Sequence, residues 1–203
     1  VVAGTTTSVG QNGNKNSKNI VVARLNSNGT LDTAFGTAAD NTPDGMVNLS
    51  LGHGDDVANA LALQSDGKIL VAGTASGPSG SGNDMAVARL NTDGSLDVTF
   101  GAGNKDGSPD GVVTLSLGNG NDEAVAVAVQ SDGRVVVVGN STSTSTNGSA
   151  NIVVARLSTL GVLDATFGTV NDGSPDGVVN VSLSDGDDVA NGMAIQADGK
   201  ILV

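Results

Sequence analysis

Apolar and polar positions follow one recurring order along the chain. A glycine-led stretch alternates apolar with polar residues, a mostly apolar stretch follows, and an Asp-Gly pair separates it from a nearly continuous apolar run. Alternation at every second position predicts a strand with one buried face, and a short continuous apolar run predicts a strand buried on both faces. Asp-Gly predicts a tight hairpin, because glycine accepts the positive φ of such turns. These hairpins are expected at Asp66-Gly67, Asp132-Gly133 and Asp198-Gly199.

The pattern repeats every 66 residues, as the spacing of Gln64, Gln130 and Gln196 shows. Each copy predicts four strands, and polar loops of variable length are expected between the third and fourth. In one copy the strands are 45–51, 57–64, 69–73 and 85–90, and the variable loops of the three copies are 5–19, 74–84 and 140–150. The copies are assigned to 1–68, 69–134 and 135–203, so that the chain starts and stops inside the same strand.

The two middle strands of each copy predict burial on both faces, which a β-propeller provides because each blade lies between its neighbours. Helix formers are scarce, with Glu123 the single glutamate, and this also favours an all-β chain. We therefore expect three tandem four-stranded antiparallel blades. Propellers have about four to eight blades, so three would form a partial propeller or an open superhelical array.

Two longer motifs resemble a known family. Residues 89–101 read RLNTDGSLDVTFG and residues 64–73 read QSDGKILVAG, and both recur in the other copies. They are similar to the delta-60 repeat, a family of bacterial β-propeller-like repeats. The resemblance covers essentially the whole chain and implies a propeller-like fold, but it supplies no catalytic residues.

Net charge excludes some function classes. The formal charge is −12, whereas a nucleic-acid-binding face needs positive charge to neutralise phosphate. The same charge argues against binding to anionic membranes, and no apolar run is long enough for a membrane span. There is no cysteine, which excludes disulfides and a thiol nucleophile.

An arginine recurs in the fourth strand, and an aspartate follows it eight residues later. A charged side chain in an apolar strand needs a partner, because an unpaired buried charge is costly. We predict structural ion pairs, with ligand binding as the alternative. The pairs are Arg24 with Asp32, Arg89 with Asp97, and Arg156 with Asp164.

Paired aspartates flank a proline-containing turn in each copy. Oxygen-rich loops suit Ca²⁺, which takes about six to eight oxygen ligands. The alternative is that these aspartates only shape the turn, because Asp and Pro favour chain reversal. The candidate calcium ligands are Asp40 and Asp44, Asp106 and Asp110, and Asp172 and Asp176.

Further polar features have simpler interpretations. The glycine- and aspartate-rich stretch 52–56 is expected to connect strands, and His53 has no fixed Ser or Cys partner for a catalytic triad. A serine/threonine-rich loop is the best candidate for O-linked sugar. Its residues are Ser141, Thr142, Ser143, Thr144, Ser145 and Thr146.

These observations lead to an expected function. We expect no enzyme, but a structural or interaction segment of a large repetitive extracellular protein or filament on a prokaryotic cell surface. Its partners would be copies of itself or adjacent repeats of the same chain, with no nucleic acid and no membrane insertion. The alternative is a propeller that binds glycan or protein through its variable loops. Calcium is the one ligand ion that the sequence suggests.

Overall fold

The computed structural model describes residues 1–9, 15–36, 44–52, 54–76, 82–101, 110–117, 120–142, 148–168 and 176–203. Within these ranges all regular structure is β-strand, which confirms the all-β prediction. The strands are β1 (Val2–Val9), β2 (Lys15–Ala23), β3 (Met46–Leu49), β4 (Val57–Leu63), β5 (Ile69–Ser76), β6 (Asn83–Leu90), β7 (Val112–Leu115), β8 (Asp122–Val129), β9 (Val135–Ser141), β10 (Asn151–Leu157), β11 (Val178–Val181), β12 (Ala194–Ile195) and β13 (Ile201–Leu202). No helix in the described ranges is long and apolar enough to cross a membrane.

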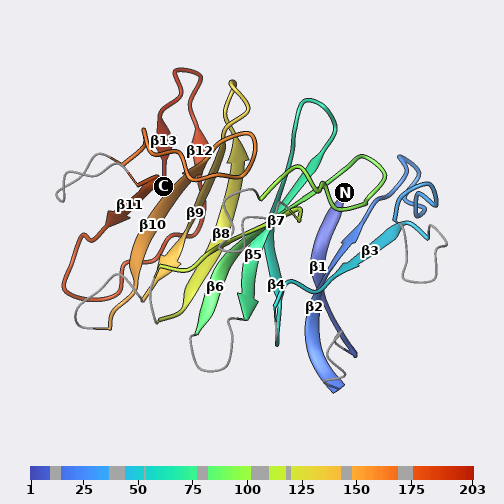
Figure 1. Ribbon diagram of the computed structural model, residues 1–203, viewed down its shortest axis with the longest axis horizontal. Helices are drawn as coiled ribbons and strands as arrows, with labels where there is room; N and C mark the ends of the chain where they lie inside the picture. Colours follow the sequence, from blue (N-terminus) through green and yellow to red (C-terminus); the bar gives the residue numbers. More distant parts are fainter. Residues whose placement is uncertain are drawn as a thin grey trace.

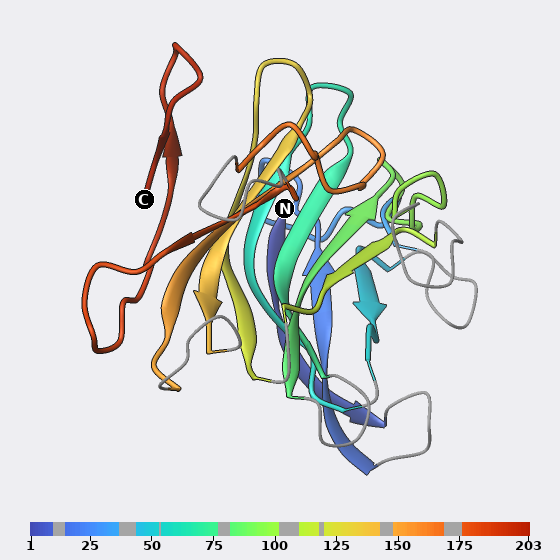
Figure 2. The ribbon, with the colours of Figure 1, turned by 60° about the vertical axis from the view of Figure 1, so that its left-hand side comes forward.

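The strands form four antiparallel sheets that follow one another in chain order (Figure 1). The sheets are β1-β2-β3, β4-β5-β6-β7, β8-β9-β10-β11 and the hairpin β12-β13. Figure 2 shows this last hairpin at the end of the row. The sheets do not close into a ring, so the architecture is a partial β-propeller with two complete four-stranded blades.

The blades are out of phase with the sequence ranges 1–68, 69–134 and 135–203. The strand that follows the recurring glycine comes last in each of the first three sheets, because β3 pairs with β2, β7 with β6 and β11 with β10. A repeat of fixed period reads the same from any starting point, so periodicity alone does not determine which strands share a sheet.

The apolar patterns explain where the core lies. β5 is buried along almost its whole length, as predicted for a strand covered on both faces, and β6 is buried to the same degree. The same prediction for β4 is wrong, because β4 is the edge strand of its sheet and is only partly buried. In β5, Leu70 packs in a cluster shared with the following sheet, whereas Val71 packs in a cluster shared with the preceding sheet. Alternate side chains thus serve two different cores, and the chain is held together by burial between successive blades.

The predicted Asp-Gly hairpins are present. Gly67 has a φ of 85°, and its N–H donates to Gln64 O at 3.0 Å. Gln64 N in turn donates to Lys68 O at 2.9 Å, which joins β4 to β5. The same two bonds close the turns at Gly133 and Gly199.

The predicted polar loop 5–19 is wrong for most of its length. Residues up to Val9 belong to β1 and residues from Lys15 belong to β2, and Thr5 pairs with Ile20 in the ladder between them. Threonine is β-branched and fits a strand as readily as a loop. Shorter parts of the loops 74–84 and 140–150 are also strand, namely 74–76, 83–84 and 140–141.

Candidate functional site

The structure brings together all three arginine–aspartate pairs suggested by the sequence. The distance from arginine Nε to aspartate Oδ2 is 2.7 Å for Arg24–Asp32, 2.7 Å for Arg89–Asp97 and 2.9 Å for Arg156–Asp164. The arginine lies in or just beyond β2, β6 or β10, and the aspartate lies in the turn that follows. The middle pair is the most buried, with 6% and 4% of the two side chains exposed.

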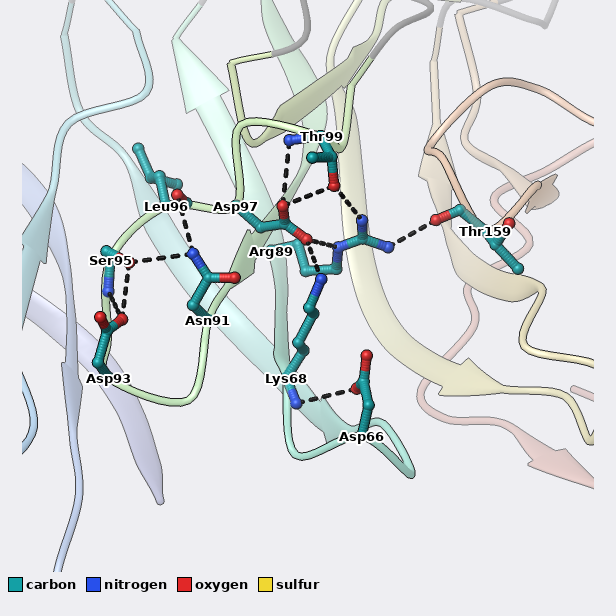
Figure 3. Close-up of polar contacts among 10 residues, drawn as sticks. All are labelled: Asp66, Lys68, Arg89, Asn91, Asp93, Ser95, Leu96, Asp97, Thr99 and Thr159. Atoms are coloured by element: carbon teal, nitrogen blue, oxygen red, sulfur yellow. Dashed lines mark hydrogen bonds and ion pairs between the residues drawn. The ribbon is translucent and has the colours of Figure 1, made fainter.

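The aspartate of each pair also shapes its own turn. Oδ1 of Asp97 accepts hydrogen bonds from Thr99 N at 3.0 Å and Thr99 Oγ1 at 2.7 Å, while Oδ2 binds Arg89 (Figure 3). Asp164 and Thr166 repeat this arrangement. One carboxylate therefore fixes the turn and the arginine together.

These contacts lower the pKa of the carboxyl groups. Burial opposes ionisation of Asp97, but hydrogen bonds from Lys68 and Thr99 and attraction to Arg89 outweigh it and hold the pKa well below its usual range. Hydrogen bonds from Thr166, assisted by Arg156, lower the pKa of Asp164 to about 2. Both groups are therefore carboxylates at neutral pH.

A phenylalanine ring packs against the arginine of each pair, so that each cluster consists of an arginine, an aspartate and a phenylalanine. The guanidinium carbon lies 4.7 Å from the ring centroid of Phe35 for Arg24, 4.4 Å from Phe100 for Arg89 and 4.6 Å from Phe167 for Arg156. These are cation–π distances, and such a contact contributes about 0.5–2 kcal/mol depending on its desolvation. The three phenylalanines of the chain thus share one role.

Sequence reasoning missed a second cation on two of the aspartates. Lys68 Nζ lies 2.7 Å from Asp97 Oδ2, and Arg134 Nε lies 2.9 Å from Asp164 Oδ2. Both cations come from the residue after the Asp-Gly turn, so the hairpin motif and the Leu-Asp-x-x-Phe-Gly motif meet at one carboxylate. The recurrence of a basic residue at this position every 66 residues was the available signal.

The clusters around Arg24 and Arg89 also bond to the next blade, which the sequence did not predict. Arg89 Nη1 donates to Thr159 O at 2.6 Å, 70 residues along the chain (Figure 3). Arg24 Nη1 donates to Thr92 O in the same way. The glycine after each phenylalanine makes a second bond to the next blade. Gly36 N donates to Asp93 O at 2.8 Å, and Gly101 N donates to Leu160 O at 3.0 Å.

The acidic turns were the candidate calcium site. Asp40, Asp106 and Asp172 lie outside the described residues. Their described partners each accept a hydrogen bond from the backbone N–H two residues later, at 2.9–3.0 Å, as Asp does in a simple turn. These are Asp44, Asp110 and Asp176. The described part of the chain contains no cluster of three or more metal-ligating side chains.

Another aspartate, also missed, recurs in the connection between blades. Asp56 is fully buried, and its Oδ2 accepts from Leu51 N at 2.7 Å and Gly52 N at 3.3 Å. Burial raises the pKa of Asp56, although those backbone hydrogen bonds oppose the change. Asp122 and Asp188 accept the equivalent bonds, so this loop does connect strands as expected. His53 lies outside the described residues.

The prediction of O-linked sugar is wrong at Ser141, the first residue of the serine/threonine-rich loop. Ser141 is fully buried at the end of β9, and its hydroxyl donates to Asp122 Oδ1, so it is closed to a sugar. Thr142 is half-buried and bonded to Asn121. Ser143, Thr144, Ser145 and Thr146 lie outside the described residues.

A comparison with protein-family models matches the segments 1–35, 64–100 and 130–167 to the domain of unknown function DUF5122 β-propeller. Together these segments make up more than half of the chain. The chain belongs to this β-propeller family. No curated protein matches the chain.

Each segment matched by the family model ends at the phenylalanine of one arginine–aspartate–phenylalanine cluster. The three matched segments end at Phe35, Phe100 and Phe167, and the second and third begin at Gln64 and Gln130 of the hairpin. The DUF5122 propeller unit thus runs from the hairpin through the arginine, aspartate and phenylalanine. In this arrangement the charged groups are used to bind one another and the next blade.

Proposed function

We propose that the chain is a non-enzymatic structural and interaction segment of a large repetitive protein, of the delta-60 repeat kind, on the outside of a prokaryotic cell. The observation that carries this proposal is that the recurring charged residues bond to one another and to the next blade. In the first two copies the arginine, and the glycine after the phenylalanine, are bonded to the next blade. These recurring groups therefore hold successive blades together.

Composition supports the same proposal. A formal charge of −12 keeps such a protein soluble and repels nucleic acid and anionic lipid. The partners we propose are therefore adjacent repeats of the same chain or further copies of it, without nucleic acid and without membrane insertion. Calcium remains a proposed ligand of the acidic turns, where it would reduce repulsion between carboxylates.

The alternative function is binding of glycan or protein through the variable loops. It is favoured by the β1–β2 hairpin, which is longer than the corresponding hairpins and carries Thr5, Thr6 and Thr7 on β1. Its weakness is that the loop segments 5–19, 74–84 and 140–150 contain no aromatic residue for stacking on a sugar.

Antibody labelling of cells that produce the protein tests the proposal. Antibodies raised against residues 1–203 are expected to label intact cells, and protease added to intact cells is expected to remove the label. Labelling that requires permeabilised cells would overturn the surface assignment. A glycan array with the purified protein tests the alternative, for which specific retention of one class of sugar is required.

A further inference from the structure

Five asparagines of the chain begin an Asn-x-Ser/Thr sequence, which is the acceptor signal for N-linked glycans. A signal this short arises often by chance in a chain rich in Asn, Ser and Thr. The fold separates the five, because a bulky glycan can be attached only to a side chain on the surface. They are Asn28, Asn48, Asn140, Asn147 and Asn180.

Three of the five do not lead to a site. Asn140 Oδ1 accepts from Ala190 N at 2.7 Å and Asn140 Nδ2 donates to Ala190 O at 3.5 Å, so both ends of this amide bind the backbone of a following segment. Asn28 lies in the turn after β2, whose counterparts in the next two copies dock on the preceding blade, where a glycan would crowd the contact. Asn147 lies outside the described residues. Two candidates remain.

Asn48 and Asn180 occupy the same place in two different blades. They lie on β3 and β11, the outermost strands of their sheets, where Asn48 pairs with Val21 and Asn180 pairs with Val153. Both asparagines are exposed, and the residues on either side of each are more buried. Successive side chains of a strand point to opposite faces, so the pairing register turns both asparagines toward solvent.

The second copy shows that this exposure belongs to the position. Thr114 of β7 corresponds to Asn48 and Asn180, and it pairs with Ala86. Its sheet packs against a sheet on each side, yet Thr114 is exposed, whereas Val112 on the same strand is buried in the core shared with the first blade. Blades arranged around an axis are farthest apart at their outermost strands, which explains why a neighbouring blade does not cover this position.

The choice of residue at this position is a second observation. Threonine is enriched in strands and asparagine is depleted, so Thr114 suits a strand better than asparagine does. A serine follows two residues later in all three copies, as Ser50, Ser116 and Ser182. The asparagine alone therefore decides whether the acceptor signal is complete. Two of the three copies carry the residue that is less favourable in a strand, and both of them have a complete signal.

We propose that Asn48 and Asn180 are acceptors of N-linked glycans on the outer strands of the propeller. The sugar donor would be an oligosaccharide carried on a lipid pyrophosphate and transferred by an enzyme of the cell envelope. Asparagine Nδ2 forms a bond to the anomeric carbon and loses a proton, while the bond from that carbon to the pyrophosphate breaks and the pyrophosphate leaves with the electron pair. The inference rests on the extracellular location in the proposed function, because this signal is used in secreted chains.

A glycan at these positions would protect the edges of the sheets. β3 and β11 are four residues long, and each pairs with one strand among the described residues. The outer edge of such a strand can pair with a strand of another chain, and proteins commonly shield edges of this kind. A bulky, hydrated group beside the edge would block that pairing and keep a repetitive β-chain soluble.

Mass spectrometry of peptides from the protein isolated from its producing cells tests the proposal. The peptides with Asn48 and Asn180 are expected to carry a sugar mass, and the peptide with Asn140 is expected to carry none. Ser50→Ala and Ser182→Ala are each expected to abolish the sugar at their own site and leave the other site modified. The asparagine is retained in both variants, so the loss would report the complete signal rather than the amide alone.

The second copy supplies matched variants in both directions. Asn48→Thr and Asn180→Thr introduce the residue that this position already has in β7, so these variants are expected to fold and to lose their glycans. Thr114→Asn completes a third signal with Ser116 and is expected to add a third glycan. Thermal unfolding checks the fold of each variant. If one change at a site prevents folding, the other change at that site gives the answer.

Four results would overturn the inference. They are protein from producing cells without sugar at either asparagine, sugar that survives the serine-to-alanine change at its site, modification of Asn140 as complete as that of the exposed sites, and folded Thr114→Asn without a third glycan. Cell labelling answers a separate question. Unmodified protein that labels intact cells removes only the glycans, whereas modified protein that labels only permeabilised cells removes only the surface assignment.

Discussion

Arg89 and Thr159 are 70 residues apart in the chain, yet Arg89 Nη1 donates to the Thr159 carbonyl at 2.6 Å. The same guanidinium binds Asp97 within its own blade and lies over the ring of Phe100. A planar group with five donors can serve all three directions at once, which a lysine cannot. Arg89 therefore joins the turn of one blade to the turn of the next.

Replacing this arginine is expected to cost more than replacing its counterpart Arg156 in the third blade. Arg89→Ala leaves the buried Asp97 with Lys68 as its one remaining cation and removes the bond to Thr159, and breaking a buried pair costs about 3–5 kcal/mol. Arg156 is more exposed, and among the described residues it has no bond to a following blade, so Arg156→Ala should cost about 1–2 kcal/mol, between the values for a surface pair and a buried pair. Urea unfolding of the two variants measures the loss in free energy of unfolding. Equal losses would contradict the role of Arg89 in holding two blades together.

Acid is expected to weaken the fold through Asp97 and Asp164. Both carboxyl groups have a lower pKa in the folded state than in the unfolded state, so their contribution is complete above the unfolded pKa, about 4, and is lost as the pH falls. For Asp164 the loss occurs between about pH 4 and about pH 2, and for Asp97 it continues further down. Asp56 acts in the opposite direction, because its pKa is raised and its protonation stabilises the fold as the pH falls.

Asp97→Asn separates these effects. The variant should be less stable than the wild type at neutral pH, but it should lose less stability between pH 7 and about pH 3. Urea unfolding at the two pH values measures the difference. Parallel losses in the variant and the wild type would show that Asp97 does not carry the acid sensitivity.

The sequence predicted what local chemistry and periodicity determine. Asp66-Gly67 closes a hairpin as expected, and Arg89 meets Asp97 because both lie in one blade, eight residues apart. The fit of Arg89 to Thr159 was not predictable, since it depends on the angle at which one blade packs on the next. Asp56 looked like an ordinary loop residue, and only its burial in the fold reveals its bonds to the backbone.

Asp176 allows turn formation to be separated from calcium binding. Its Oδ1 accepts from Val178 N at 2.9 Å, at the start of β11. Asp176→Ala removes that acceptor and should cost about 1 kcal/mol. Asp176→Asn keeps an oxygen in the same place, so its urea unfolding should match that of the wild type without calcium. Destabilisation by Asn as large as that by Ala would contradict the turn role.

Calcium is tested with the same variant. If the acidic turns bind Ca²⁺, calcium raises the unfolding midpoint of the wild type, and the increase falls in Asp176→Asn because a carboxylate ligand is lost. Thermal unfolding with added calcium and with chelator measures both midpoints. A wild-type midpoint that is the same in the two conditions would remove calcium from the proposed function.

Gly139 and Gly4 occupy the same motif position but have different surroundings. A Cβ on Gly139 would lie 1.9 Å from Glu123 O and 2.7 Å from Met85 Cε, because β8 bulges against β9 at this point. Gly139→Ala should therefore cost about 3 kcal/mol, at the upper end for overpacking. A Cβ on Gly4 would meet nothing within 4 Å, so Gly4→Ala should change the stability of the monomer by less than about 0.5 kcal/mol. Urea unfolding of Gly139→Ala, with Gly4→Ala as the matched control, measures the difference, and equal losses in the two variants would contradict the close approach of β8 to Gly139.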